Sequence, residues 1–244
     1  MVKFFESSYT YDYSFPAVTL AYFLRYPNPY STHVLSTDVI SRTIDEQGRL
    51  KTLRIHRKSS RLPSAVLKLL PKSVLGNISG GRSESYILET STIDVKEGSM
   101  RTESKNLDWT GILSVVEKQE YQRKVPDDEG DDFNVAAGRT GVVTTVMFRS
   151  RLGDRLRARA NRKDEAREEV EEKKGFLASW STSGIQRSIE SIASRRTENQ
   201  LGKSKEGMKI VLERLRSGGL VGVLEGMRKD REMAFGGESV WKHS

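Results

Sequence analysis

A stiff connector near the N-terminus carries the side chains best suited to bind an anion. Pro27 and Pro29 flank Asn28, and neither proline fits a helix interior, because its ring lacks an N–H and clashes with the preceding turn. Arg25 precedes this connector and His33 follows it. An arginine, an asparagine and a histidine around one rigid turn form a reasonable anion-binding corner. The alternative is an ordinary Pro-rich turn with a surface arginine, and the residue types alone leave both open.

The segments around this connector have clear secondary-structure patterns. Aromatic and β-branched residues predict a strand over 2–13, and apolar residues at helical spacing predict a short helix over 15–23. After the connector, alternating residues predict strands over 34–44 and 50–57, joined by a turn at 45–48. We therefore expect the connector to lie between a helix and a β-hairpin.

More strands follow along the chain. Alternating or apolar segments predict strands over 86–95, 100–109, 112–121 and 141–148. Short turns join most of them, which favours an antiparallel meander, because parallel strands need long crossover connections. The predicted fold class is α+β.

The longest helical pattern covers 183–217, and one of its faces changes character along its length. This stripe consists of Ile185, Ile189, Ile192, Arg196, Gln200 and Lys203. Facing inward, such a stripe would bury cations, which is costly unless an anionic group pairs with them. A pocket with an apolar tunnel and an anionic head resolves that conflict.

Composition limits the chemistry. The 244 residues include no cysteine, so disulfides, thiolate metal sites and cysteine nucleophiles are excluded. The three histidines are scattered, and no phosphate loop or nucleophile motif is present. We expect no catalytic residue, no metal and no cofactor. A net charge of +8 favours anionic partners, namely nucleic acid, a membrane surface or a phosphorylated ligand. No apolar run approaches the ~20 residues of a membrane span.

Two charged segments interrupt the pattern. Residues 123–139 form an acidic, solvated loop, and 151–174 is a charged insertion, basic first and acidic later. The basic half, 151–162, offers a second function, a basic nucleic-acid-binding or scaffold protein, although charge runs are usually solvated surfaces. The domain organisation predicted is one domain over 1–217 and a Gly-rich, loosely ordered tail over 218–244.

The string Arg-Tyr-Pro-Asn-Pro-Tyr-Ser over 25–31, followed by His-Val-Leu-Ser over 33–36, resembles the signature of the PRELI-like (Ups-type) mitochondrial lipid-transfer family. It is similar in particular to the fungal-like branch that moves phosphatidic acid. The resemblance covers 1–121 and 175–217. It implies a curved antiparallel sheet of about six to seven strands wrapped around the long helix, with a lid loop closing a lipid pocket.

The resemblance also implies a role. The protein would carry phosphatidic acid, or alternatively phosphatidylserine, between the outer and inner mitochondrial membranes and support cardiolipin synthesis. Composition alone predicts a cytosolic protein, whereas the resemblance implies the intermembrane space, peripheral to the membranes. The implied partners are anionic membrane surfaces and a small disulfide-bonded helical-hairpin protein that forms a heterodimer with the carrier. No nucleic acid is expected.

The resemblance assigns residues to two sites. The implied lipid-headgroup residues are Arg25, His33, Lys58, Arg61, Arg196, Gln200 and Lys203. The implied lid residues, which would touch the membrane, are Leu62, Val66, Leu69 and Leu70. From the residues alone, this short apolar segment is equally consistent with a loop helix packed on the core.

Overall fold

The structure is a computed structural model of the whole chain. It describes residues 2–61, 78–79, 82–108, 110, 113–124, 138–150 and 173–235, without the side chains at 2–3, 60–61, 78–79, 82, 150, 173–196 and 235.

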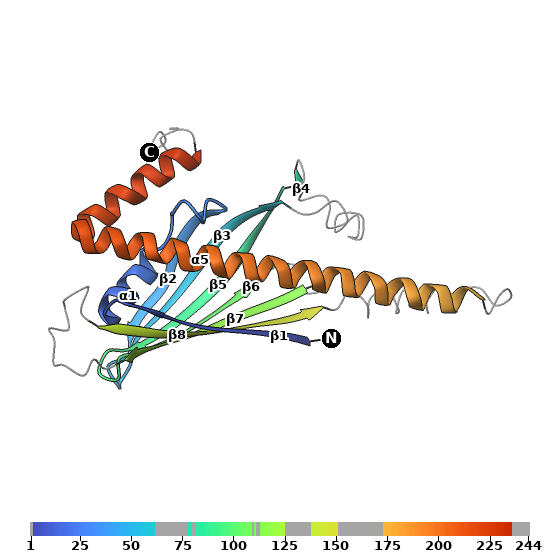
Figure 1. Cartoon of the computed structure of the whole chain (residues 1–244), viewed down its shortest axis with the longest axis horizontal. Coiled ribbons are helices and arrows are strands. Elements are labelled where there is room, and N and C mark those ends of the chain that lie inside the picture. Colours follow the sequence, from blue (N-terminus) through green and yellow to red (C-terminus); the bar gives the residue numbers. More distant parts are fainter. Residues whose placement is uncertain are drawn as a thin grey trace.

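One antiparallel sheet forms the framework of the described chain (Figure 1). Its strands are β1 (Val2–Tyr11), β2 (Val34–Ile44), β3 (Leu50–Arg61), β4 (Ile78–Ser79), β5 (Arg82–Asp94), β6 (Ser99–Asn106), β7 (Leu113–Lys124) and β8 (Arg139–Ser150). The order is β1-β8-β7-β6-β5-β3-β2, with the two-residue β4 paired to β5 off this path. The predicted meander is confirmed, although β3 continues to Arg61, beyond the predicted end at 57.

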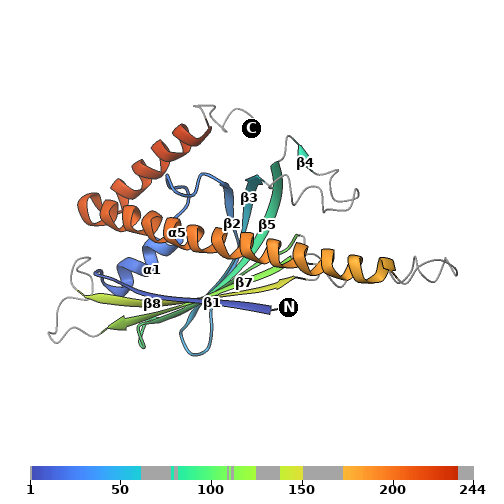
Figure 2. The ribbon, with the colours of Figure 1, turned by 45° about the vertical axis from the view of Figure 1, so that its right-hand side comes forward.

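Two helices lie on the same side of the curved sheet (Figures 1 and 2). Helix α1 (Phe15–Phe23) has Pro16 in its first turn, where the missing N–H has no intrahelical partner to lose. Helix α5 (Lys173–Phe235) crosses the sheet and packs on α1. The α+β class, the short N-terminal helix and the long C-terminal helix are therefore confirmed. No helix in the described ranges is long and apolar enough to cross a membrane.

The C-terminal end of α5 corrects the prediction of a loosely ordered tail from 218. The helix breaks at Gly219, which has φ 59° and ψ −154°, and then continues to Phe235. The glycines that suggested disorder allow close packing instead. A Cβ atom at Gly222 would lie 3.2 Å from the Arg214 carbonyl oxygen, and one at Gly226 would lie 2.5 Å from Arg214 Nε. The rest of the predicted tail, 236–244, lies outside the described residues, as do 125–137 and 151–172 of the two charged segments.

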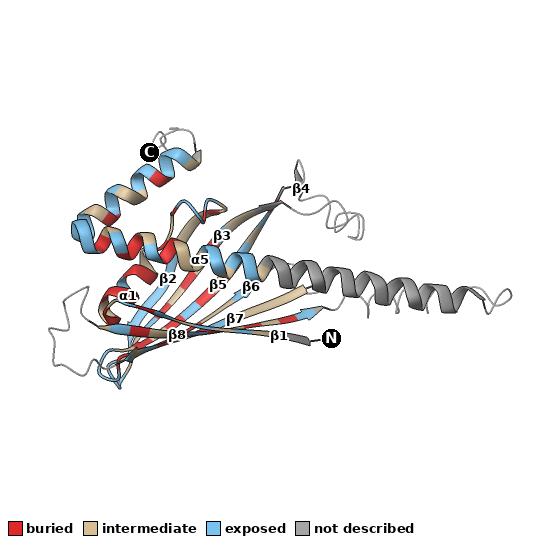
Figure 3. Ribbon diagram, in the orientation of Figure 1, coloured by how far each residue is buried: buried red, intermediate tan, exposed pale blue. Residues whose placement is uncertain are grey.

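The apolar core lies at one end of the molecule, where α1 packs between α5 and the sheet (Figure 3). Val18 and Ala21 of α1 are fully buried there, as are Val211 and Leu212 of α5. The core fixes α1 and α5 on the sheet. The inner face of β3 is polar, because Arg54 and His56 are buried while their neighbours Leu53 and Ile55 are only half-buried.

A glycine on α5 sets how closely this helix approaches the connector between α1 and β2. A Cβ atom at Gly207 would lie 2.8 Å from Asn28 Nδ2 and 3.0 Å from Asn28 Cγ. Asn28 cannot easily move away, because it donates to the Arg25 carbonyl at 2.5 Å and accepts from the Tyr30 amide at 2.9 Å. Gly207 therefore fits this position because it has no side chain.

We expect Gly207→Ala to lower the free energy of unfolding by about 1–3 kcal/mol, the usual cost of overpacking. The control is Gly202→Ala on the same helix, where a Cβ atom would meet nothing within 4 Å. That change should raise stability by up to about 1 kcal/mol, because alanine favours the helix. Urea denaturation of the two variants measures the difference, and equal effects would contradict the contact.

Candidate functional site

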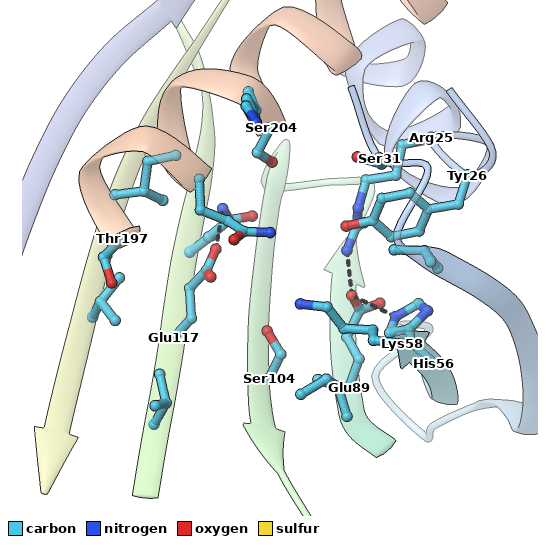
Figure 4. Close-up of a pocket in the computed structure, with 18 of the residues that line it drawn as sticks. Arg25, Tyr26, Ser31, His56, Lys58, Glu89, Ser104, Glu117, Thr197 and Ser204 are labelled. Carbon is cyan, nitrogen blue, oxygen red and sulfur yellow. Dashed lines mark hydrogen bonds and ion pairs between the residues drawn. The ribbon is translucent and has the colours of Figure 1, made fainter. Parts of the chain in front are cut away.

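A cavity of about 300 Å³ lies between α5, the connector and the middle of the sheet (Figure 4). In Figure 4, Arg25 and Tyr26 enter from the connector, Glu89 from the sheet, and Thr197 and Ser204 from α5. Apolar residues line another part of the wall, and these are Val34, Ile87, Leu113, Val115, Val146, Phe148, Leu201 and Met208. This volume is at the lower end of the range for small-molecule sites.

Five of the seven predicted headgroup residues line this cavity: Arg25, His33, Lys58, Gln200 and Lys203. Arg61 ends β3 and Arg196 lies within α5, but both side chains lie outside the described residues. The predicted lid residues Leu62, Val66, Leu69 and Leu70 also lie outside them. The structure thus brings the connector and the long helix together, and the direct headgroup contacts remain predictions.

Two lysines supply positive charge to the cavity wall. The ammonium groups of Lys58 and Lys203 form no ion pair or hydrogen bond with another described residue. Their charge acts on His33, which lies near both. Burial, and then Lys58 and Lys203, lower the pKa of His33 to about 4. The imidazole is therefore neutral at pH 7, and its Nε2 accepts a hydrogen bond from Gln200 Nε2 at 2.9 Å.

A buried charge cluster centred on Glu89 forms a neighbouring part of the wall. Glu89 is 1% exposed and accepts hydrogen bonds from one terminal nitrogen each of Arg25 and Arg54. Arg54 Nε donates a further bond to Glu89 Oε1 at 2.9 Å, and His56 Nε2 donates to Oε2 at 3.1 Å. Because one carboxylate meets two guanidinium groups, the cluster keeps a net charge of +1 beside the cavity.

The ionisation states in this cluster follow from burial and neighbouring charge. Burial by itself would raise the pKa of Glu89, but Arg25, His56 and Arg54 together hold it well below its usual value. Burial lowers the pKa of His56, although Glu89 opposes that shift. A neutral His56 suits its contacts, because its other nitrogen, Nδ1, accepts from Thr37 Oγ1 at 2.9 Å.

Arg25 is held in the wall by contacts within the protein. Its Nη1 donates to the Tyr22 carbonyl at 2.9 Å and its Nη2 donates to Glu89. The guanidinium carbon also lies 3.7 Å from the centroid of the Tyr22 ring. Both terminal nitrogens thus have partners, so the positive charge of Arg25 reaches the cavity from a fixed position.

Glu89 and Glu117 line the cavity but are not among the residues predicted from the sequence. Alternation placed Glu89 on one face of a predicted strand, but its position directly opposite Arg54 of β3 depends on the register, which the sequence pattern does not provide. Glu117 of β7 also lines the cavity and accepts a hydrogen bond from Gln119 Nε2 at 2.8 Å. Burial raises the pKa of Glu117, so this carboxyl is the one acidic group in the described wall that is driven toward its neutral form.

Comparison with known proteins identifies the family. Residues 16–159, more than half of the chain, match the sequence model of the PRELI-like family. The chain belongs to the PRELI-like family. It is 41% identical over 122 residues to "Protein UPS1, mitochondrial" from Saccharomyces cerevisiae, a match that covers 50% of this chain and 65% of that protein. It is also 41% identical over 116 residues to "Protein ups1 homolog" from Schizosaccharomyces pombe, covering 48% and 60%.

A mammalian PRELI-like relative is more distant. "PRELI domain-containing protein 1, mitochondrial" from Bos taurus is 32% identical over 122 residues, covering 50% of this chain and 52% of that protein. The chain therefore matches less than two thirds of the length of each relative. Among solved structures, an aromatase/cyclase from Streptomyces aligns with a TM-score of 0.45 and 12% identity, over 90% of this chain and 99% of that one. A similarity this low supports no functional argument.

We expect Glu89→Gln to cost about 3–5 kcal/mol of stability, because it leaves two buried guanidinium groups without their carboxylate. The matched control is Glu84→Gln on the same strand, where the exposed pair with Arg57 contributes little. Thermal or urea unfolding of both variants at neutral pH measures the contrast. A Glu89→Gln protein as stable as the Glu84→Gln protein would contradict the structural role of the cluster.

The same carboxylate predicts a dependence of stability on pH. Since the folded-state pKa of Glu89 is lowered, its contribution is complete above the unfolded-state pKa, ~4.3, and is lost as the pH falls toward the lower folded-state value. The free energy of unfolding of the unmodified protein should therefore fall more steeply below about pH 4.3 than that of Glu89→Gln. Parallel pH profiles would show that Glu89 is not the group responsible.

Proposed function

We propose that this PRELI-like protein carries anionic phospholipids, phosphatidic acid in particular, between the outer and inner mitochondrial membranes. The observation that supports the proposal is a pair of cations, Lys58 and Lys203, whose ammonium groups have no partner among the described residues and which line a cavity that also has apolar walls. The names of two relatives, from Saccharomyces cerevisiae and Bos taurus, describe them as mitochondrial. The role would place the carrier in the intermembrane space, where it would support cardiolipin synthesis.

The charges of the cavity suit a phosphomonoester. Such a headgroup carries a charge of about −1.5 to −2 near neutral pH. Lys58 and Lys203 offer two ammonium groups, and the Glu89 cluster in the neighbouring part of the wall adds a net positive charge. An ionised headgroup between the lysines would give their ammonium groups the charged partner that no described residue supplies.

Phosphatidic acid fits this arrangement better than phosphatidylserine does. The serine headgroup has a singly charged phosphodiester in place of the phosphomonoester. It also carries a carboxylate, which the lysines could bind, and an ammonium group, which would meet Lys58, Lys203 and the positively charged Glu89 cluster. The one acidic side chain in the described wall that could pair with it, Glu117, is driven toward its neutral form by burial. Phosphatidylserine remains the alternative lipid.

The acyl chains would meet the apolar part of the wall. Val115 of β7 and Phe148 of β8 are paired in the sheet and face the cavity, and Leu201 and Met208 approach from α5. Each buried CH₂ group contributes about 0.8 kcal/mol, so release of a lipid into water would be slow. Loading and unloading would then take place at a membrane, with the lid residues predicted over 62–70 as the contact.

The proposed function also includes a protein partner. The carrier would form a heterodimer with a small disulfide-bonded helical-hairpin protein, whose disulfides would all be its own because this chain has no cysteine. We do not propose the nucleic-acid function for 151–162, since that segment lies outside the described residues and no contact favours it.

The site predicts a loss of transfer in Lys58→Ala/Lys203→Ala. A charge-assisted hydrogen bond contributes about 1.5–3 kcal/mol, so each lysine should matter by roughly tenfold or more in affinity for phosphatidic acid. The assay is transfer of fluorescent phosphatidic acid between liposomes by the protein co-expressed with its partner, with phosphatidylserine and phosphatidylcholine for comparison. Lys96→Ala, in the exposed turn between β5 and β6, is the control.

The outcomes of this assay separate the site from the function. Transfer of phosphatidic acid that survives the double substitution would keep the carrier and reject the headgroup site. Faster transfer of phosphatidylserine than of phosphatidic acid would identify phosphatidylserine as the cargo. No transfer of any lipid by the folded, partnered protein would reject the carrier proposal.

Cargo binding should also raise the pKa of His33. Without ligand, burial and the two lysines hold this pKa at about 4. A dianionic headgroup between the lysines would offset their field and favour the imidazolium. Binding would then take up a proton, and affinity should rise as the pH falls through the pKa of the bound state. NMR titration of the His33 ring with and without short-chain phosphatidic acid measures the shift, and an unchanged pKa would place the headgroup elsewhere.

A further inference from the structure

The last turns of α5, after the break at Gly219, form a helix that is fixed on the protein by one side only. Val223 is fully buried. Asp230 is 4% exposed and accepts two hydrogen bonds from Arg214, with Nη1 to Oδ2 at 2.6 Å and Nη2 to Oδ1 at 3.1 Å. The close approach of Gly226 to Arg214 adds to this anchoring. The inward side of residues 220–235 is therefore determined.

A second side of this helix, centred about 110° around the axis from Val223, is apolar at its start and cationic further on. Leu220, Val221 and Leu224 are 50%, 66% and 51% exposed. Arg228 and Arg231 follow and are also exposed. With 3.6 residues per turn, all five side chains fall within an arc of about 100°. We call these five residues the C-terminal outer face.

The described structure places nothing over the C-terminal outer face. Figures 1 and 2 show residues 220–235 turning away from the long part of α5, and Figure 3 shows their outer side predominantly exposed. The acidic residues Glu225 and Glu232 lie at one edge of the face, and Met233 and Lys229 lie beyond it. The centre of the face thus offers apolar and basic groups only.

This combination fits an anionic phospholipid surface. A helix that lies in a membrane interface buries apolar side chains at the level of the headgroups, while its basic side chains bind lipid phosphates. A second copy docked through the same face would set the apolar and basic centre of one face against the same groups of the other, with no acidic residue at the centre to pair with the arginines. Charge complementarity therefore favours the membrane.

We propose that the C-terminal outer face is a membrane-docking surface for anionic phospholipid bilayers. Its five residues are neither among those that line the cavity nor among those predicted for the lid, and the surface goes beyond the proposed carrier function. The anchoring contacts of Val223 and Asp230 would keep the face turned outward, so the helix would dock without leaving the protein.

The absence of cysteine in the chain allows a site-specific test. Leu224→Cys and Met233→Cys, each labelled with an environment-sensitive fluorophore, report on opposite sides of the same helix, because nine residues correspond to about 180°. Met233 is 75% exposed, so both substitutions affect surface positions only. Vesicles of phosphatidylcholine alone, or of phosphatidylcholine with phosphatidylglycerol, provide the neutral and anionic surfaces.

With anionic vesicles, we expect the fluorescence emission of the label at 224 to move to shorter wavelengths and to increase in intensity. The emission of the label at 233 should change little. Arg228→Gln and Arg231→Gln should each lower the partition coefficient about fivefold, corresponding to about 1 kcal/mol per cation. Lys229→Gln, outside the face, serves as the charge control. Circular dichroism of each variant checks that the helix content is unchanged.

Three results would overturn the proposal. The first is an equal response at 224 and 233, and the second is binding that Arg228→Gln and Arg231→Gln leave unchanged. The third is a response at 224 that grows with protein concentration without vesicles, which would assign the face to a second copy. Lipid transfer is measured separately, so a protein that transfers lipid but shows no response at 224 loses this surface and keeps its proposed function.

Discussion

Glu89 accepts hydrogen bonds from Arg25, Arg54 and His56 at the place where the connector, β3 and β5 meet. A buried carboxylate is tolerated only when its partners are complete, and here they come from three separate segments. The pair with Arg25 ties the end of α1 to the sheet, and Arg54 adds a bond to the carbonyl of Phe23 at 3.2 Å. The position of the connector, and with it the cavity, therefore depends on this one carboxylate. Because two guanidinium groups share one carboxylate, the net charge of this part of the cavity wall is positive.

The sequence contained the periodic elements but not their partners. Alternation and helical spacing located the strands and α1, because such patterns reflect which side of an element is buried. Register does not follow from periodicity, so the pairing of Arg54 with Glu89 stayed hidden, although both residues sat on predicted strands. The glycines at 222 and 226 led to a wrong prediction, because they suggested a loosely ordered tail where the chain is helical and closely packed. Glycine marks loose chain and close packing equally well, and only the position of Arg214 distinguishes the two.

The cavity residues likewise include some that the sequence predicted and some that it did not. Arg25, His33, Gln200 and Lys203 were found from a stiff turn, a helical stripe and a family signature, and they converge although the chain between them is long. Glu117 escaped notice, because a carboxyl group argues against an anion site until its burial is known. Its raised pKa makes it compatible with the lysines, and that property arises only from the folded surroundings.

The contact between Gly207 and Asn28 has a consequence for the ancestry and redesign of such chains. The turn that carries Arg25 and His33 meets the helix that carries Gln200 and Lys203 where Asn28 approaches the Gly207 backbone, in addition to the hydrogen bond between His33 and Gln200. A substitution on either side of the contact changes the geometry of both, so the two segments should vary together as one inherited unit. A chimera meant to change lipid selectivity would have to exchange turn and helix as a pair, since a foreign turn on the native helix would separate the two halves of the anion corner.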